Sequence, residues 1–182
     1  MSSKTYYFVG IGGIGMSAIA RYLKNNGHNI YGYDRTRTQL TAELEKEGMN
    51  ITYEENLNHL PEVIDLAIYT PAIPAENKIL KEIIKRGIQL NKRAFALAEK
   101  KKKKKVIAIA GTHGKTTTSG LLAHLLYNSK IGCSAFLGGI ANNYSTNMLC
   151  DTKSEYVVVE ADEYDRSFLN LNPFVSAITS IS

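Results

Sequence analysis

Apolar positions along the chain follow two different periods, which predict strands and helices in alternation. Short, continuous apolar runs, as expected of buried strands, occupy residues 5–9, 29–33 and 66–69. Apolar residues three or four positions apart, as on one face of a helix, occur in residues 13–26, 38–48 and 76–87. A short strand at residues 88–90 and a helix at residues 93–100 follow. This alternation predicts an α/β fold with a parallel sheet and helices on its faces.

The alternation starts again in the second half of the chain. Residues 106–110 form an apolar run typical of a buried strand, and the glycine-rich turn after it leads into a predicted helix that ends near Asn128. Further strands are predicted at residues 156–160 and 175–181. Residues 138–147, rich in Gly, Asn and Ser, are predicted to form a loop. The second half therefore repeats the strand, loop and helix order of the first.

Positive charge is concentrated in one segment, the run of six lysines at residues 100–105. The formal net charge of +5 becomes −1 when these six lysines are set aside, so the remaining chain is close to neutral. We interpret the run as a solvated hinge and expect no nucleic-acid or membrane partner. A domain boundary is predicted here: residues 1–102 form one α/β domain, and residues 103–182 form part of a second. The second part has too few predicted strands for a complete parallel domain.

The cysteines and the N-terminal segment predict a reduced, cytoplasmic protein. Cys133 and Cys150 are 17 residues apart, without the spacing of a zinc site. A strand is predicted almost from the first residue, with no charged and apolar leader before it. No apolar stretch approaches the length of about 18 residues that a membrane helix needs.

The strongest functional signal is the segment AGTHGKTTT at residues 110–118, between a predicted strand and a predicted helix. Backbone N–H groups of such a turn bind phosphate oxygens, Lys115 reaches the terminal phosphates of ATP, and Thr116 offers its hydroxyl to Mg²⁺. The usual pattern has four residues between its glycines, whereas only two separate Gly111 from Gly114. The predicted ATP-binding residues are Gly111, Thr112, His113, Gly114, Lys115, Thr116 and Thr117.

A second glycine-rich turn, GIGGIGM at residues 10–16, follows the first predicted strand. In its G-x-G-x-x-G pattern Gly10 permits the tight turn, Gly12 lets the backbone approach a phosphate, and Gly15 allows close helix packing. Asp34 ends the next strand, where an acceptor for ribose hydroxyls belongs. The pattern by itself fits the dinucleotide of an NAD-dependent oxidoreductase. Two phosphate-binding turns in separate domains, however, favour an enzyme that uses ATP and holds a second, nucleotide-like substrate.

Four carboxylates lie at and after the strand predicted at residues 156–160. Glu160 emerges at the carboxyl end of this strand, where ligands bind in parallel sheets. Carboxylate oxygens beside a triphosphate suit Mg²⁺, so Glu160 is predicted to be a metal ligand together with Thr116. A role in the site and an exposed acidic turn both remain open for Asp162, Glu163 and Asp165.

The motifs GIGGIGM, GTHGKTTT and EADEYDRSFL together resemble those of the Mur ligases of bacterial cell-wall synthesis, and the resemblance covers essentially all 182 residues. It implies a Rossmann-like first domain that binds UDP-N-acetylmuramate, not a dinucleotide. Part of a P-loop-type domain that binds ATP and Mg²⁺ would follow, with Lys115 and Glu160 as catalytic residues. The residues implied to lie near the UDP-sugar are Gly12, Gly13, Ile14, Gly15, Asp34, Thr70, Ala72, Arg93, Gly138, Gly139 and Asn142.

The resemblance also implies a reaction. His113 in the shortened turn, with Gly13 to Met16, favours the branch that joins L-alanine to UDP-N-acetylmuramate in peptidoglycan synthesis, through an acyl phosphate formed from ATP. The segment Glu163-Tyr164-Asp165 is shared with a muropeptide-recycling ligase, which is the main alternative. An NAD-dependent oxidoreductase and a P-loop NTPase without an acceptor acid are the others. Family members carry a further domain that binds the amino acid, so the 182-residue chain alone is expected to be inactive. Formation of a homodimer is left open.

Overall fold

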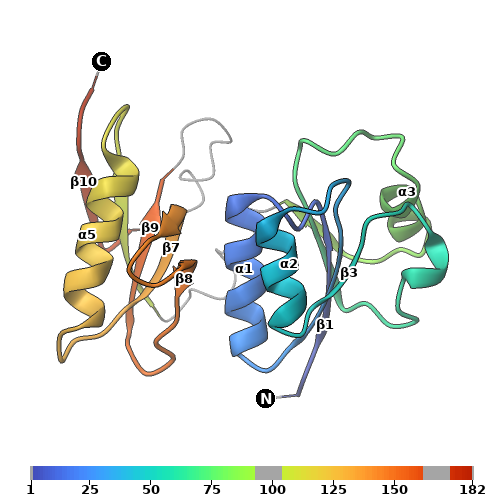
Figure 1. Cartoon of the computed structure of the whole chain (residues 1–182), viewed down its shortest axis with the longest axis horizontal. Helices are drawn as coiled ribbons and strands as arrows, with labels where there is room; N and C mark the ends of the chain where they lie inside the picture. Colours follow the sequence, from blue (N-terminus) through green and yellow to red (C-terminus); the bar gives the residue numbers. More distant parts are fainter. Residues whose placement is uncertain (1, 93–103, 162–172, 182) are drawn as a thin grey trace. The chain divides into compact units, whose positions relative to one another are not determined.

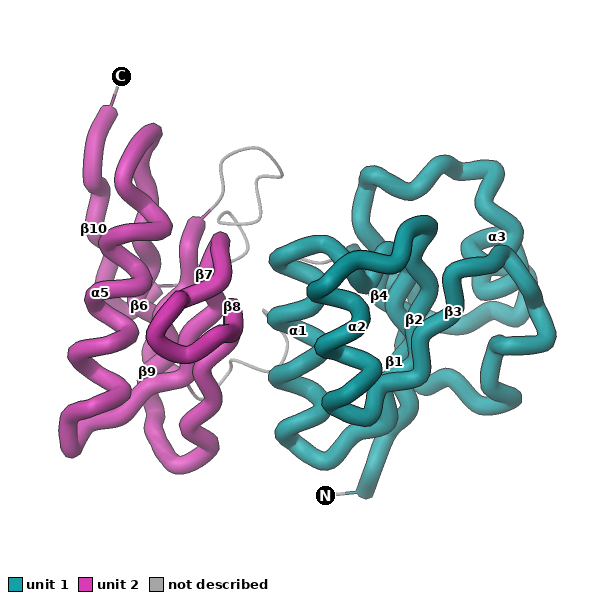
Figure 2. Tube along the Cα trace, in the orientation of Figure 1, with its two compact units in different colours: residues 1–93 teal, residues 94–182 magenta. Residues whose placement is uncertain are grey.

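The structure is a computed structural model that describes residues 2–92, 104–161 and 173–181. The chain divides into two compact units, residues 1–93 and residues 94–182 (Figure 2). Several predictions concern residues outside the described ranges. These are the helix at residues 93–100, the domain boundary between residues 102 and 103, and the side chains of Arg93, Asp162, Glu163 and Asp165.

Unit 1 is built on a five-stranded parallel sheet with the strand order β3-β2-β1-β4-β5. The strands are β1 (Thr5–Val9), β2 (Asn29–Tyr33), β3 (Asn50–Thr52), β4 (Leu66–Tyr69) and β5 (Leu90–Lys92). The chain proceeds from β1 first to one side and then to the other, so β1 lies at the point where the strand order reverses. In such sheets ligands bind at the carboxyl ends of the strands around this point. The predicted Rossmann-like architecture is confirmed.

Helices cover both faces of this sheet (Figure 1). Helices α1 (Ile14–Asn25) and α2 (Gln39–Lys46) lie on one face. Helix α3 (Lys78–Lys85) and the 3-10 turn η1 (Leu57–His59) lie on the other. On the α3 face, one buried cluster includes Tyr7, Val9, Tyr33, Ile79 and Ile83. The alternation of side chains along β1 and β2 thus matches the spacing of apolar positions along α3.

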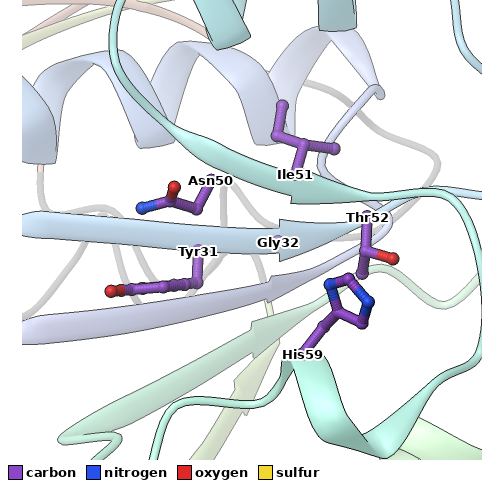
Figure 3. A pocket seen from close by; sticks show the side chains of 6 residues that line it. All are labelled: Tyr31, Gly32, Asn50, Ile51, Thr52 and His59. Atoms are coloured by element: carbon purple, nitrogen blue, oxygen red, sulfur yellow. The ribbon is translucent and has the colours of Figure 1, made fainter.

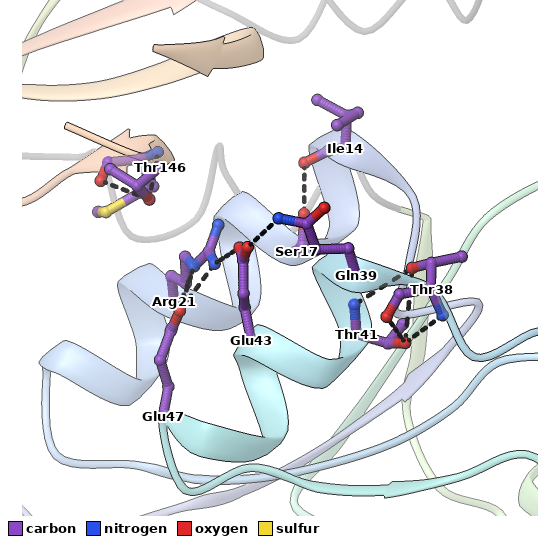
Figure 4. Close-up of polar contacts among 10 residues, drawn as sticks. Ile14, Ser17, Arg21, Thr38, Gln39, Thr41, Glu43, Glu47 and Thr146 are labelled. Atoms are coloured by element: carbon purple, nitrogen blue, oxygen red, sulfur yellow. Dashed lines mark hydrogen bonds and ion pairs between the residues drawn. The ribbon is translucent and has the colours of Figure 1, made fainter. Parts of the chain in front are cut away.

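Ion pairs of a buried arginine with two partly exposed carboxylates join α1 to α2 (Figure 4). The side chain of Arg21 is only 5% exposed, and its guanidinium donates hydrogen bonds to Glu47 at 2.7 and 2.9 Å and to Glu43 at 3.4 Å. A buried guanidinium is tolerated only with such charged, hydrogen-bonded partners. Glu43 in α2 and Glu47 at its C-cap lie four residues apart, on one side of the helix. These ion pairs therefore fix α2 against the helix that begins at the first glycine turn.

Unit 2 contains a five-stranded sheet with the order β10-β6-β9-β7-β8. The strands are β6 (Lys105–Ala110), β7 (Ser134–Ala141), β8 (Thr146–Leu149), β9 (Tyr156–Glu160) and β10 (Val175–Ile178). The β10–β6, β6–β9 and β9–β7 pairs are parallel, and the β7–β8 pair is antiparallel. Helix α5 (Lys115–Tyr127) follows β6 and packs against β7 and β9. The strand, glycine turn and helix predicted for the second half are present.

The prediction of a loop at residues 138–147 is wrong, because most of this segment forms a hairpin. Residues 138–141 belong to β7, residues 142–145 form the turn, and β8 begins at Thr146. The pairing of β7 with β8 is irregular between Phe136 and Ala141. Glycine and asparagine are uncommon in strands, so the sequence of this segment did not indicate one. In the structure these residues are accommodated where the pairing of β7 with β8 is irregular. Gly138 and Gly139 therefore lie on a strand, and Asn142 lies in the turn after it.

Candidate nucleotide-binding sites

The first glycine turn joins β1 to α1 in unit 1. Gly10 has φ +88°, a backbone conformation that favours glycine, and its N–H donates to the carbonyl of Tyr33 at 2.8 Å. A Cβ atom on Gly10 would lie 2.5 Å from Cγ2 of Thr70. The predicted residue Thr70 therefore contacts this turn directly. Its Oγ1 accepts a long hydrogen bond, 3.5 Å, from the N–H of Ala72, so the second predicted residue lies next to Thr70.

Asp34 binds the first glycine turn itself. Its Oδ2 accepts a hydrogen bond of 2.7 Å from the N–H of Gly12, and its Oδ1 accepts one of 3.3 Å from the N–H of Thr36. A Cβ atom on Gly12 would lie 2.8 Å from Oδ2 of Asp34, so glycine is required for this approach. Burial, with the nearby charges of Glu55 and Asp34, raises the pKa of the Tyr33 phenol above its usual value. Asp34 thus orders the turn, and Tyr33 beside it remains neutral.

Among the α-helices of the described residues, the two that follow the glycine turns, α1 and α5, begin without a side-chain cap. The N-terminal residues Gly13 of α1 and Gly114 of α5 provide no side-chain hydrogen bond, and neither helix has an acidic residue in its first turn. By contrast, Thr38 caps α2 (Figure 4) and Asn77 caps α3. First-turn N–H groups without such caps, at the positive end of a helix dipole, favour an anion. The helix N-termini at Gly13 and Gly114 therefore both suit phosphate groups.

The side chain of Lys115 folds back onto the backbone of the second glycine turn. Gly111 and Gly114 have φ values of +126° and +81°, so both adopt backbone conformations that favour glycine. The ammonium group of Lys115 donates to the carbonyl of Gly111 at 2.5 Å. This cation and the N–H groups at the start of α5, which includes Thr116 and Thr117, lie at one end of the unit 2 sheet. The arrangement is the one expected for binding a chain of phosphates.

Three segments converge beside Thr116. Its hydroxyl donates to Oε1 of Glu160 at 2.9 Å, and the N–H of Gly138 donates to Oε2 of the same carboxylate at 3.0 Å. A Cβ atom on Gly139 would lie 3.5 Å from Cγ2 of Thr116. The start of α5, the end of β9 and the irregular part of β7 thus meet at one carboxylate. Within the described ranges, no three His, Cys, Asp or Glu side chains gather as a metal site.

Several predicted residues lie apart from these contacts. Asn142, predicted to contact the UDP-sugar, lies in the hairpin turn of unit 2. The N–H groups of Thr112 and His113, two residues predicted to bind ATP, donate to Ser180 after β10. Neither Thr179 nor Ser180 was predicted as a site residue. The available signal was their position: they directly follow β10, which is parallel to β6, so they lie at the ligand-binding edge where the second glycine turn begins.

A separate pocket of about 230 Å³ lies on β2 and β3 of unit 1 (Figure 3). Its wall is formed by Tyr31, Gly32, Asn50, Ile51, Thr52 and His59. The imidazole of His59, from η1, lies next to Thr52 at the end of β3. None of these residues belongs to the predicted phosphate sites, which are formed by the two glycine turns.

In the described part of the chain, no helix has the length and apolar character needed to cross a bilayer.

Comparison with known proteins gives a consistent group of relatives. The family profile described as "Mur ligase family, catalytic domain" matches residues 5–105. The "UDP-N-acetylmuramate--L-alanine ligase" of Porphyromonas gingivalis is 50% identical over 182 residues, which are 97% of this chain and 40% of the relative. The protein of the same name from Phocaeicola vulgatus is 47% identical over the same shares. The chain therefore spans about 40% of the length of these relatives.

Solved structures agree with these relatives. The crystal structure of a UDP-N-acetylmuramate-alanine ligase from Thermotoga maritima superposes with a TM-score of 0.89 at 33% identity, over 97% of this chain and 41% of that one. A UDP-N-acetylmuramate:L-alanyl-gamma-D-glutamyl-meso-diaminopimelate ligase from Neisseria meningitides also has a TM-score of 0.89, over 100% of this chain and 61% of that one. At 24% identity it shows the shared fold. Because the family profile matches more than half of its residues, the chain belongs to the Mur ligase family.

Proposed function

We propose that the full-length protein is an ATP-dependent ligase that joins L-alanine to UDP-N-acetylmuramate in peptidoglycan synthesis, and that it acts in the cytoplasm. One observation carries the proposal: in a member of the Mur ligase family, Lys115 and Thr116 lie at the uncapped start of α5, and Thr116 donates a hydrogen bond to Glu160. The relatives named for this reaction, at 47% and 50% identity, support the choice of substrates. They also favour a ligase over an NAD-dependent oxidoreductase.

The two units would divide the ligands between them. In unit 1 the diphosphate of the UDP-sugar would bind at Gly12 to Gly15, beside Asp34, Thr70 and Ala72. In unit 2 the triphosphate of ATP would bind at Gly111 to Thr117. The assignments of Arg93 and Asn142 to the UDP-sugar, and of the domain boundary to residues 102 and 103, stay predictions.

In the proposed reaction the lactyl carboxylate of UDP-N-acetylmuramate attacks the γ-phosphate of ATP, which gives an acyl phosphate and ADP. The amine of L-alanine then attacks the acyl carbon, and phosphate leaves as the amide forms. Phosphoryl transfer of this kind depends mainly on positioning and on neutralising charge. Lys115 would move from the carbonyl of Gly111 to the phosphates, and the N–H groups at the start of α5 would bind phosphate oxygens.

Thr116 and Glu160 are suited to binding a magnesium ion. The hydroxyl oxygen of Thr116 and Oε1 of Glu160 lie 2.9 Å apart at the edge of the predicted phosphate site. Mg²⁺ prefers oxygen ligands and is usually held by one or two carboxylates, with phosphate and water completing its shell. Thr116 and Glu160 would hold the ion, which when bound would offset the negative charge of the phosphates.

The choice of amino acid separates the proposed ligase from the recycling ligase. We expect the full-length protein to form UDP-N-acetylmuramoyl-L-alanine, ADP and phosphate in equal amounts when given ATP, Mg²⁺, UDP-N-acetylmuramate and L-alanine. Mass spectrometry of the product and a phosphate assay provide the measurement. Efficient use of the tripeptide L-alanyl-γ-D-glutamyl-meso-diaminopimelate in place of L-alanine would identify the recycling ligase instead. ATP hydrolysis that needs no acceptor acid would contradict both. The 182-residue chain, assayed alongside, is expected to form no product.

A further inference from the structure

The end of β10 binds the backbone of the second glycine turn. The N–H of Thr179 donates to the carbonyl of Ala110 at 2.9 Å, and the Thr179 hydroxyl lies within hydrogen-bond distance of the carbonyls of Ala110 and His113. Because the hydroxyl has one proton, it donates to one of these carbonyls at a time. Ser180 accepts two hydrogen bonds from the turn. Its carbonyl accepts one from the N–H of Thr112 at 3.0 Å, and its side-chain Oγ accepts one from the N–H of His113 at 2.9 Å. Thr179 and Ser180, directly after β10, thus bond four backbone groups of residues 110–113: the carbonyls of Ala110 and His113 and the N–H groups of Thr112 and His113.

These contacts decide which N–H groups of the turn are free for a phosphate. The N–H groups of Thr112 and His113 are used by Ser180, so the donors that can face phosphate begin at Gly114. Gly111 has no room for a side chain, because a Cβ atom there would lie 2.9 Å from both the backbone N and O of Ser180. The first half of the turn is therefore bonded to the residues that follow β10, whereas Gly114 and Lys115 begin α5.

We infer that Thr179 and Ser180 are positioning residues for the phosphates of ATP, an inference that rests on the proposed function. The turn has two residues fewer between its glycines than the usual phosphate loop. The short turn leaves Thr112 and His113 to bond with β10, and this bonding fixes the backbone from which Gly114 and Lys115 present their groups. Thr179 and Ser180 touch the turn, and they act on the phosphates through it.

The exposure of the two side chains separates this role from a general effect on folding. Thr179 is exposed and Ser180 is half-buried. Hydroxyl groups at such positions contribute little to global stability, since water replaces their lost partners. Removing either hydroxyl should therefore leave the protein folded and loosen the turn.

The test measures binding of a non-hydrolysable ATP analogue with Mg²⁺ to the full-length protein by calorimetry. We expect Thr179→Val and Ser180→Ala each to raise the dissociation constant about fivefold to tenfold, as loss of a hydrogen bond that orders a binding site should. Thr179→Ser keeps the hydroxyl and should restore binding to within about twofold. Ser176→Ala, which removes a hydroxyl from β10 away from the turn, is the control and should bind like the wild type. The KM for UDP-N-acetylmuramate should stay constant in all four variants.

The outcomes distinguish this inference from the function on which it rests. Unchanged affinity for the analogue in both Thr179→Val and Ser180→Ala, with the wild type active, would overturn the positioning role alone. Equal loss in Thr179→Ser and Thr179→Val, with a lowered melting temperature in both, would also overturn it, because the effect would then be on folding. A wild-type protein that binds no ATP analogue and forms no amide would overturn the proposed function as well.

Discussion

Replacement of Lys115 by methionine is expected to lower the kcat of the full-length ligase roughly 100-fold to 1,000-fold. Removal of a single preorganised group that stabilises charge in the transition state has an effect of this size. The Lys115 ammonium is held at the second glycine turn by the carbonyl of Gly111, at 2.5 Å. Methionine keeps most of the side-chain length and removes the charge. Steady-state kinetics with ATP, L-alanine and UDP-N-acetylmuramate measure the effect.

The matched control is Lys130→Met, which removes an exposed lysine after α5 and should leave kcat unchanged. Because the UDP-sugar is assigned to unit 1, its KM should stay constant in both variants. A Lys115→Met enzyme with wild-type kcat would show that this lysine does not act on the transferred phosphate.

Substitution of Gly138 by alanine is expected to lower kcat about 100-fold, as misplacement of a catalytic group by about 1 Å can do. The new Cβ atom would lie 2.7 Å from Cδ of Glu160 and too close to both carboxylate oxygens. The Glu160 carboxylate can avoid this clash by moving away from β7, which would disturb its contact with Thr116, the other proposed magnesium ligand. We also expect the Mg²⁺ concentration at half-maximal rate to rise.

Gly139→Ala is the neighbouring comparison for this experiment. A Cβ atom on Gly139 would lie 3.5 Å from Cγ2 of Thr116, which is ordinary van der Waals contact. Gly139→Ala should therefore cost much less activity than Gly138→Ala. Similar losses in both variants would mean that the hairpin itself, not the position of the Glu160 carboxylate, limits the reaction.

The order of strands, glycine turns and helices could be predicted from the sequence because each depends on neighbouring residues. The runs of apolar residues identify β1 and β6, and the glycines that follow them permit the backbone conformations seen at Gly10 and Gly111. The position of Glu160 at the end of β9 was predictable for the same reason. Local pattern therefore sufficed to locate Lys115 and Glu160, the two residues predicted to be catalytic.

The side of helix α5 that packs against the sheet was less predictable. Its leucines have helical spacing, which correctly predicts a helix. Leu122 and Leu126 pack against the buried cluster, whereas Leu121 and Leu125 are 61% and 59% exposed. Because α5 is apolar on more than one side, its sequence does not identify the face that meets the sheet.

Contacts between distant segments were the part that the sequence could not provide. Arg21 finds its carboxylates 22 and 26 residues away, and His113 finds Ser180 67 residues away. Asp34 was predicted to face a ribose, yet the structure also pairs it with the N–H of Gly12. Each of these contacts depends on how strands are ordered in a sheet, and periodicity does not encode that order.

The most direct test of the proposed activation of a carboxylate by ATP is an isotope-transfer measurement with the full-length protein. UDP-N-acetylmuramate labelled with ¹⁸O in its lactyl carboxylate is incubated with ATP, Mg²⁺ and L-alanine, and the released phosphate is analysed by mass spectrometry. We expect each phosphate formed with the amide to carry one oxygen from the labelled carboxylate. Amide formation with no ¹⁸O in the phosphate would contradict the acyl phosphate and the roles assigned here to Lys115 and Glu160.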